Sequence, residues 1–368
     1  MRNVNVLGIV FPNRHDACLT GLTALRSMGS VPFGGRYRLI DFVLSNMVNA
    51  GVSKVGIATM SRYQSLMDHL GSGKAWDLDR KNGGLYFLPT RASNDAYAGR
   101  VSVLDEMRLF LSNSKEEYVL LSDCNVVGNI DYAALIQQHI DNGADITVAC
   151  KGGDAPQPSG NLLVRMNEAG ELTDVRIGEA AAGDAWSLGL FVVRRELLLE
   201  LVREANSRNQ DDFERDILQR RLGELRLFGY TVPEYTLSIV SLESYFNANM
   251  ALLDSTVRRQ LFLPHRRIYT KVRDCAPAVY GLHAAVSDSL VADGAVVEGA
   301  VTRSVLFRDV KVGRDVCLEN CVVMQGSEID GNARLNYVIC DKNTRIGDAV
   351  ALQGVATYPV YVKKNMKV

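Results

Sequence analysis

Residues 4–11 read VNVLGIVF, an almost uninterrupted apolar run of the kind that forms a strand buried on both faces of a parallel sheet. Residues 38–50 carry apolar side chains at helical spacing and are followed by Gly51, which predicts a helix that ends there. The same criteria predict strands over residues 55–58, 118–121 and 145–150, and a helix over residues 133–142. Strands that alternate with helices in this way predict a doubly wound α/β sheet, in which ligands bind beyond the carboxyl ends of the strands.

The sequence changes character after about residue 275, where the helical periodicity disappears. Two series of aliphatic residues recur at intervals of 17 residues, or once 16: Val312, Ile329 and Ile346, and Val305, Val322 and Val338. Together with aliphatic residues about six positions apart, they form a hexapeptide pattern, which predicts a parallel β-helix. About five coils fit between residues 286 and 360. The alternative, a small β-sandwich, would show longer strands with alternating polarity.

These two patterns divide the chain into three parts. Residues 1–256 are expected to form the α/β domain, and residues 279–368 the β-helix domain. Residues 257–278, which include two prolines, are expected to form the linker between them.

The composition excludes several classes of protein. The chain has 368 residues, and its 41 Lys and Arg nearly balance its 42 Asp and Glu, so nothing indicates nucleic-acid binding. The N-terminal apolar run is too short to span a membrane and lacks a secretory cleavage site, which predicts a cytoplasmic protein without membrane contact. The seven cysteines are scattered and do not form a zinc-binding set. A small molecule or another protein is therefore the expected partner.

The most specific motif lies between residues 22 and 46, where LTALR is followed by VPFGGRYRLIDF and LSN. Further blocks read AWDLDR (75–80), GLYFLP (84–89), ESYFNAN (243–249) and, at the end of the chain, VKKNMKV (362–368). Together these motifs resemble the signature of glucose-1-phosphate adenylyltransferases over essentially the whole chain, and most closely that of the GlgD-type subunits. The resemblance implies a Rossmann-like nucleotidyltransferase domain of the GT-A-like type, followed by a left-handed parallel β-helix of hexapeptide repeats.

The phosphate-binding loop of that family is not present in its usual form. The catalytic relatives carry GGxGxRL after the first strand, where glycines let backbone N–H groups close around phosphates. Here residues 11–20 read FPNRHDACLT, without a glycine, and Pro12 removes one N–H donor. Arg14, His15 and Arg26 are candidates for a small anion-binding site, and a solvated loop is the alternative.

Other catalytic positions of the family are altered as well. Met28 stands where the relatives carry a lysine, and residues 99–103 read GRVSV in place of a GTADA turn. No lysine occurs between Lys151 and Lys271, the stretch in which the relatives place the lysine that holds the sugar phosphate. A positive charge at the transferred phosphate is the main protein contribution to such chemistry, so its loss predicts weak catalysis or none.

The two metal-binding aspartates of the family are also in doubt. The block at residues 121–125 reads LSDCN, which puts Cys124 or Asn125 at the ligand position and displaces Asp123 by one. The block at residues 237–241 reads LSIVS and places Ser238 at the second aspartate. Because Mg²⁺ prefers carboxylate ligands, we predict no metal site, with Asp123 as the one salvageable ligand. Arg26 and Asp123 are the residual catalytic candidates.

Part of the sugar-phosphate site is retained in the sequence. Tyr97, Gly160 and Ser187 match positions that contact glucose 1-phosphate in the catalytic relatives. A vestigial sugar-phosphate pocket is therefore a candidate. The alternative is that Gly160 serves a turn and Ser187 packs beside a strand.

The resemblance implies a regulatory subunit of glucose-1-phosphate adenylyltransferase, which makes ADP-glucose and pyrophosphate from ATP and glucose 1-phosphate in glycogen biosynthesis. Its own catalytic site would be degenerate. The implied partner is a catalytic homologue, in a heterotetramer, with Mg²⁺ bound by that partner and no cofactor in this chain. Self-association of the isolated chain stays open.

Three other functions are compatible with parts of the sequence. The chain could be an active adenylyltransferase with a rearranged site, or a stand-alone protein that binds a sugar phosphate or another metabolite. A hexapeptide acyltransferase would need a catalytic histidine on a coil, and His283, before the regular repeats, is the one histidine in that region.

Overall fold

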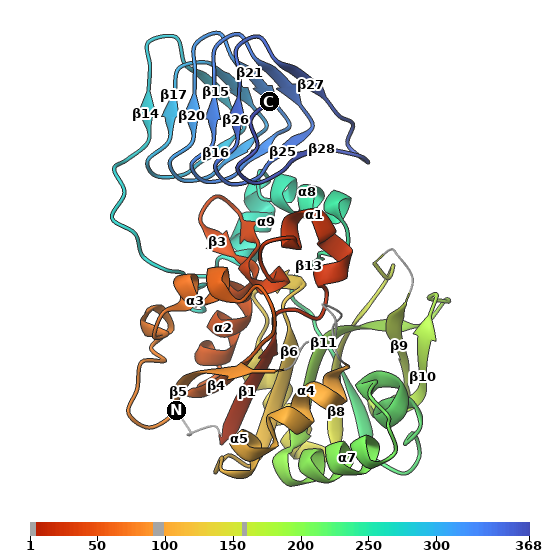
Figure 1. Ribbon diagram of the computed structural model, residues 1–368. Coiled ribbons are helices and arrows are strands. Elements are labelled where there is room, and N and C mark those ends of the chain that lie inside the picture. Colours follow the sequence, from red (N-terminus) through yellow and green to blue (C-terminus); the bar gives the residue numbers. More distant parts are fainter. Residues whose placement is uncertain (1–4, 91–98, 157–159) are drawn as a thin grey trace.

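The computed structural model describes residues 5–90, 99–156 and 160–368. An N-terminal α/β domain is followed by a C-terminal β-helix that is stacked over one end of it (Figure 1). Within the described residues, no helix has the length and apolar character needed to cross a membrane.

The N-terminal domain is built on a nine-stranded mixed sheet, in which β10-β9-β11-β6-β1-β4-β5 are neighbours, β8 lies beside β11, and β12 lies beside β8. The strands are β1 (Val6–Phe11), β4 (Lys54–Thr59), β5 (Gly84–Pro89), β6 (Tyr118–Asp123), β8 (Ile146–Gly152), β9 (Asn161–Met166), β10 (Leu172–Gly178), β11 (Ala185–Arg194) and β12 (Leu227–Thr231). The central strands β6, β1, β4 and β5 are parallel, and β11 runs antiparallel to β6. The parallel α/β centre predicted from the sequence is thus confirmed.

Helices cover both faces of this sheet, and successive side chains of β1 point alternately into the two cores that lie between the sheet and these helices. Leu7 and Ile9 belong to the core beneath α4 and α7, whereas Val6 and Val10 belong to the core beneath α2 and α6. The helices of the domain are α1 (Thr20–Thr23), α2 (Leu39–Asn49), α3 (Gln64–Leu70), α4 (Arg100–Glu106), α5 (Arg108–Ser112), α6 (Tyr132–Asp141), α7 (Arg195–Ser207), α8 (Leu242–Ala251) and α9 (Ser255–Leu261). Shorter elements are η1 (Asp16–Leu19), η2 (Met28–Ser30), η3 (Lys74–Trp76), the π-helix η4 (Phe213–Gln219), β2 (Pro32–Phe33), β3 (Tyr37–Arg38), β7 (Val126–Gly128) and β13 (Thr236–Ser238).

The C-terminal domain is a left-handed parallel β-helix of five coils, whose strands form three five-stranded sheets. The strands are β14 (Val279–Tyr280), β15 (Ala285–Ser287), β16 (Leu290–Val291), β17 (Val296–Val297), β18 (Ala300–Thr302), β19 (Val305–Leu306), β20 (Lys311–Val312), β21 (Cys317–Glu319), β22 (Val322–Val323), β23 (Glu328–Ile329), β24 (Arg334–Asn336), β25 (Val338–Cys340), β26 (Arg345–Ile346), β27 (Ala351–Gln353) and β28 (Val360–Val362).

The register of the coils confirms one predicted series and corrects the other. Val312, Ile329 and Ile346 pair in successive coils. Val322, however, pairs with Ile339 and not with Val338, so the interval of 17 residues continues where the sequence suggested 16.

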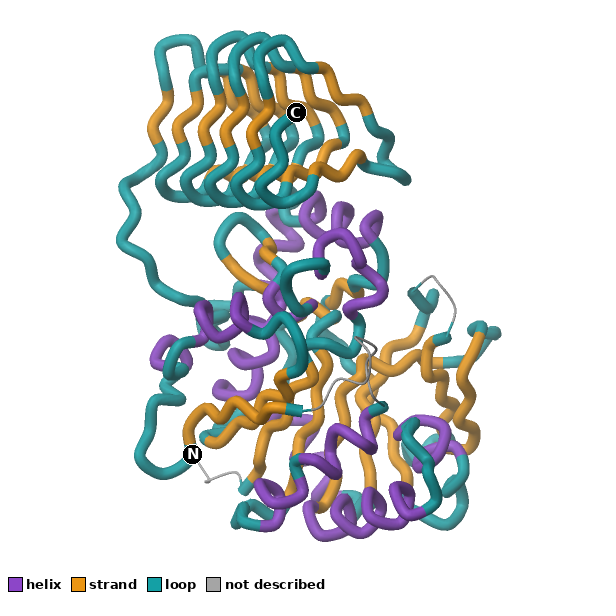
Figure 2. Tube along the Cα trace, in the orientation of Figure 1, coloured by secondary structure: helices purple, strands orange, loops and turns teal. Residues whose placement is uncertain are grey.

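The segment predicted as the linker, residues 257–278, begins inside a helix. The helix α9 covers residues 257–261 because the Asp254 carboxylate caps it, accepting a 2.7 Å hydrogen bond from the Thr256 N–H. The rest of the segment is extended and runs along one side of the molecule to the first coil (Figure 2).

The two domains share one hydrophobic core. Buried side chains of the N-terminal domain, such as Phe33 and Tyr245, belong to the same cluster as Val301 and Ile339 of the β-helix. Because this contact is hydrophobic and continuous with the cores of both domains, it restricts their relative motion.

Candidate functional site

The carboxyl ends of two adjacent strands bring the predicted site residues together. Phe11, the last residue of β1, pairs with Asp123, the last residue of β6, so the loop after β1 lies beside the Asp123 carboxylate. A pocket of about 200 Å³ opens here. It is lined by Arg14, His15, Cys18, Asp123, Asn125, Gly160, Asn161, Leu162, Ile177, Trp186, Ser187, Leu188, Gly189, Asp212, Glu214, Ser238 and Val240.

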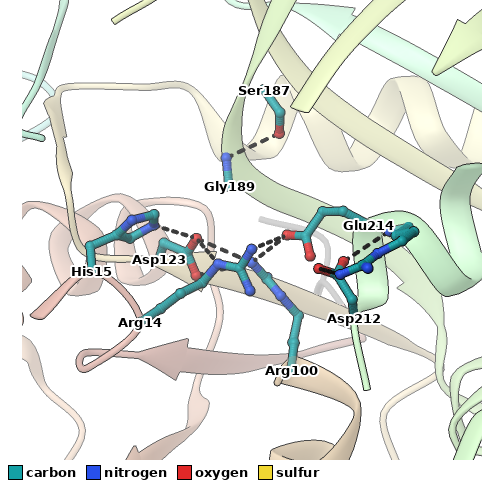
Figure 3. Close-up of polar contacts among 9 residues, drawn as sticks. Arg14, His15, Arg100, Asp123, Ser187, Gly189, Asp212 and Glu214 are labelled. Atoms are coloured by element: carbon teal, nitrogen blue, oxygen red, sulfur yellow. Dashed lines mark hydrogen bonds and ion pairs between the residues drawn. The ribbon is translucent and has the colours of Figure 1, made fainter. Parts of the chain in front are cut away.

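Three cationic or basic side chains surround the Asp123 carboxylate (Figure 3). Its Oδ2 lies 3.3 Å from Nε of Arg14, and 3.1 Å from both Nε2 of His15 and Nη2 of Arg100. Burial raises the pKa of Asp123, but the Arg100 charge and the His15 hydrogen bond outweigh burial and lower it to about 2. Burial lowers the pKa of His15, but the hydrogen bonds to Asp123 and Cys18 together with the Asp123 charge outweigh burial, so that the pKa is raised overall. Asp123 is therefore an ionised carboxylate whose charge is already balanced within the chain.

Arg100, at the start of α4, is the most deeply buried member of this cluster. Its side chain is 0% exposed, and its guanidinium lies 4.8 Å from the ring centres of Phe11 and Phe191. Its Nη2 donates to Asp123 and to Oε1 of Glu214, each at 3.1 Å. Glu214, in η4, also accepts a 2.8 Å hydrogen bond from Arg14. Two arginines thus bridge two carboxylates.

Arg100 and Glu214 were not among the residues predicted for the site. Arg100 lies in the sequence GRVSV, which was interpreted only as the loss of the family's GTADA turn and not as the source of a positive charge in the pocket. Its partner Glu214 lies 114 positions away. No local pattern around Glu214 indicates that it faces the end of β6.

The loop after β1 is fixed by its own polar groups and not by glycine. The Asp16 carboxylate accepts hydrogen bonds from the Met28 N–H at 2.6 Å and from the Asn13 side chain at 2.8 Å. Burial raises the pKa of Asp16 to about 6. Pro12 and these contacts leave a short 3₁₀ turn, η1, where the catalytic relatives place their glycine-rich phosphate loop.

Arg26 does not join Arg14 and His15. Its guanidinium is buried at the domain junction and donates to Oδ1 of Asp341, in the β-helix, at 2.7 Å. The structure therefore separates the two residual catalytic candidates: Asp123 lies in the pocket, and Arg26 ties the loop to the β-helix.

Two of the three sugar-phosphate candidates line the same pocket as Asp123. Gly160 has a φ of +113°, and Oγ of Ser187 accepts a 3.1 Å hydrogen bond from the Gly189 N–H. Tyr97 lies outside the described residues.

The described residues of the pocket do not fit the Mg²⁺ site of the family. Cys124 is buried in the core beneath α2, whereas Asp123, Asn125 and Ser238 line the pocket. Ser238 supplies a neutral hydroxyl at the second ligand position, and Asp123 is engaged by cations, so no pair of free carboxylates faces the cavity. Among the residues that the structure describes, no group of three or more His, Cys, Asp or Glu side chains is arranged to hold a metal ion.

A second pocket, at the boundary between the domains, is strongly cationic. It is lined by Pro32, Gly35, Arg36, Tyr37, Arg38, His69, Lys271, Arg273, Phe307, Arg308, Gln325 and Lys342, a set without a carboxylate. Arg308 is 5% exposed, and its Nε has no hydrogen-bond partner among the described residues. Burial lowers the pKa of Lys342 to about 7, and the charges of Arg38, Arg26 and Arg273 act in the same direction. Such a cavity favours an anion.

The two domains match two sequence families. Residues 18–255 match the nucleotidyl transferase family, and residues 278–355 match the C-terminal hexapeptide repeats of GlmU-like proteins. The fold and the pocket thus define a nucleotidyl transferase domain joined to a hexapeptide β-helix.

Similar proteins place the chain more closely. It is 34% identical to the glycogen biosynthesis protein GlgD of Bacillus subtilis (strain 168), over 100% of this chain and 98% of that protein. It is 35% identical to GlgD of Geobacillus stearothermophilus, over 85% of this chain and 82% of that protein. It is also 34% identical to a glucose-1-phosphate adenylyltransferase of Thermotoga maritima, over 84% of this chain and 75% of that protein. The chain belongs to the nucleotidyl transferase family, in the group of GlgD and glucose-1-phosphate adenylyltransferases.

Proposed function

We propose that the chain is a cytoplasmic, regulatory subunit of glucose-1-phosphate adenylyltransferase in glycogen biosynthesis, and that its own catalytic site is degenerate. Similarity to GlgD over the whole chain supports the role in glycogen biosynthesis. The proposed partner is a catalytic homologue, in a heterotetramer, which binds the Mg²⁺ that the reaction uses. The chain itself is proposed to work without a cofactor.

One observation carries the proposal that the site is degenerate. The Asp123 carboxylate, the one salvageable metal ligand, is already neutralised by Arg14, His15 and Arg100. Nucleotidyl transfer needs positive charge at the phosphates, supplied by metal ions and free cationic side chains. Here the cations near the pocket are paired with carboxylates of the chain, and the Lys and glycine positions of the family are lost.

The cationic pocket at the domain boundary supports regulation. Residues from the N-terminal domain, the linker and the β-helix all line it, so an anion bound there would contact all three. An anion that contacts several segments favours the arrangement in which they converge. By linkage, if a partner subunit binds that same arrangement preferentially, the bound anion changes the affinity of the chain for that partner.

The proposal is tested by mixing the purified chain with its catalytic homologue and measuring pyrophosphate release from ATP and glucose 1-phosphate. We expect kcat or substrate affinity in the mixture to differ by roughly fivefold or more from the homologue alone, the size of a typical coupling between sites. Light scattering on the same mixture should give the mass of a hetero-oligomer.

The control is the catalytic homologue alone at the same total subunit concentration. If the mixture shows only the sum of the separate masses and separate rates, the proposed partner is wrong.

A further inference from the structure

Three carboxylate oxygens converge on a single atom of Arg100. Its Nη2 lies 3.1 Å from Oδ1 and from Oδ2 of Asp123, and 3.1 Å from Oε1 of Glu214 (Figure 3). The Asp123 and Glu214 side chains are only 2% and 7% exposed. Buried carboxylates require a compensating cation, and Arg100 brings one to the point at which both can reach it.

The hydrogen bonds of the Arg100 guanidinium within the described residues are all made by Nη2. Nε and Nη1 of Arg100 have no hydrogen-bond partner among the described residues. The faces of the group lie instead near the rings of Phe11 and Phe191. The polar surroundings of Arg100 are therefore a set of oxygens around one nitrogen, which resembles the oxygen set around a bound metal ion.

We infer that the Arg100 guanidinium is a built-in cation between Asp123 and Glu214, and that removing it converts this position into a binding site for a divalent metal ion. Glu214 is not at the position of either metal-binding aspartate implied by the family resemblance, so the site would be a new one. Divalent cations bind sites with one or two carboxylates, and here two are held together by the fold. The inference rests on the contacts of this cluster and does not require the proposed regulatory function.

Arg14 competes for the same carboxylates. Its Nε lies 3.3 Å from Asp123, and its Nη2 lies 2.8 Å from Glu214. Its side chain is 23% exposed, so Arg14 approaches from the pocket side while Arg100 lies within the core. The double variant Arg14→Ala/Arg100→Ala should therefore bind the metal more tightly than Arg100→Ala.

The test uses the full chain and MnCl₂ as the probe, because bound Mn²⁺ loses the electron paramagnetic resonance signal of the free ion. We expect the wild type to leave the signal unchanged, Arg100→Ala to bind about one Mn²⁺, and the double variant to bind it more tightly. Without metal, the thermal midpoint of Arg100→Ala should fall by roughly 10 °C, because two buried carboxylates lose a cation. MnCl₂ should restore at least half of that loss, because a ligand that binds the folded state stabilises it.

Two further variants control for other effects of the metal. Arg26→Ala removes a different buried arginine, whose partner is the single carboxylate of Asp341, so its midpoint should fall without recovery in MnCl₂. Arg100→Ala/Glu214→Gln removes the second carboxylate and should not bind Mn²⁺. Binding of Mn²⁺ by the wild type as tight as by Arg100→Ala, equal rescue of the glutamine double variant, or no binding by Arg100→Ala would each overturn the inference.

Arg100→Gln preserves more of the side-chain volume and serves if Arg100→Ala does not fold. Refolding of this variant from urea should then depend on MnCl₂, and a refolding yield that is the same with and without the metal would overturn the inference as well. None of these measurements depends on turnover, so they stand apart from the test of the proposed function.

Discussion

Gly189 lies where β11 passes closest to the Asp123 carboxylate. Its φ is +66°, and a Cβ built on it would stand 2.5 Å from Oδ2 of Asp123. This close approach keeps the backbone of β11 against the cluster of Asp123, Arg100 and Glu214. A side chain at residue 189 therefore meets both backbone strain and the carboxylate.

We predict that Gly189→Ala lowers the free energy of unfolding by about 3 kcal/mol, measured by urea denaturation. The matched control is Gly183→Ala, since Gly183 has a φ of +86° but a Cβ built on it would meet no atom of the described residues within 4 Å. The control should lose only about 1 kcal/mol, the cost of the backbone conformation alone. Equal losses would mean that the approach to Asp123 contributes nothing.

The contacts of this cluster could be predicted from the sequence only in part. Asp123, Arg14 and His15 could be predicted as neighbours, because they follow adjacent parallel strands. Arg100 and Glu214 could not, because a contact between residues 114 positions apart depends on how α4 and η4 pack. The same holds for Arg26, which follows α1 and points at a carboxylate of the other domain.

The loop after β1 is the element that joins the pocket to the β-helix. Arg14 and His15 at its start face Asp123, and Arg26, after α1, is bound to Asp341. The hydroxyl of Tyr361 adds hydrogen bonds to the Gly21 carbonyl and to Oδ2 of Asp341. The position of this loop is thus set by the β-helix as well as by the sheet.

We predict that Arg26→Ala costs about 4 kcal/mol in the free energy of unfolding, because it leaves the buried Asp341 carboxylate without its cation. Arg26→Met/Asp341→Asn should recover part of that loss, since no unpaired charge remains. Urea denaturation of the two variants and the wild type gives both values. A loss below about 1 kcal/mol for Arg26→Ala would show that the ion pair does not hold the loop.

Strong periodicity made most elements predictable. The helix α2 and the coils around Ile329 and Ile346 follow their apolar spacing closely. The exceptions are local. The helix α9 begins at Ser255, where Asp254 caps it, and extends into the predicted linker. In the β-helix, Ile339 keeps the interval of 17 residues, although the neighbouring Val338 suggested 16.

At the scale of the whole molecule, the cationic pocket exists only because three distant segments converge. Arg36 and Arg38 come from the N-terminal domain, Lys271 and Arg273 from the linker, and Arg308 and Lys342 from the β-helix. The linker region is basic, with six Lys and Arg and no acidic residue between Asp254 and Asp274, but the balanced charge of the whole chain did not indicate that it would meet the other two segments in one pocket.

We predict that sulfate binds this pocket and that its affinity falls as the pH rises. Burial and the nearby arginines lower the pKa of Lys342 to about 7, so this lysine is charged below pH 7 and loses its charge above it. Burial lowers the pKa of His69 below its usual value, and Arg38, with a pKa of about 10, stays charged. Isothermal titration should show roughly tenfold weaker binding at pH 8 than at pH 6.

The control for that titration is Lys342→Met. This variant should bind sulfate weakly at both pH values and lose most of the difference between them. An unchanged pH dependence would assign the effect to another group.

The most direct test of the account is pyrophosphate release from ATP and glucose 1-phosphate by the purified chain alone, in the presence of Mg²⁺. With Asp123 held by three partners and the family's lysines absent, we predict a rate equal to that of the Asp123→Asn variant prepared in the same way. Robust, Mg²⁺-dependent turnover that disappears in Asp123→Asn would contradict the account, because it would show that this carboxylate still serves catalysis.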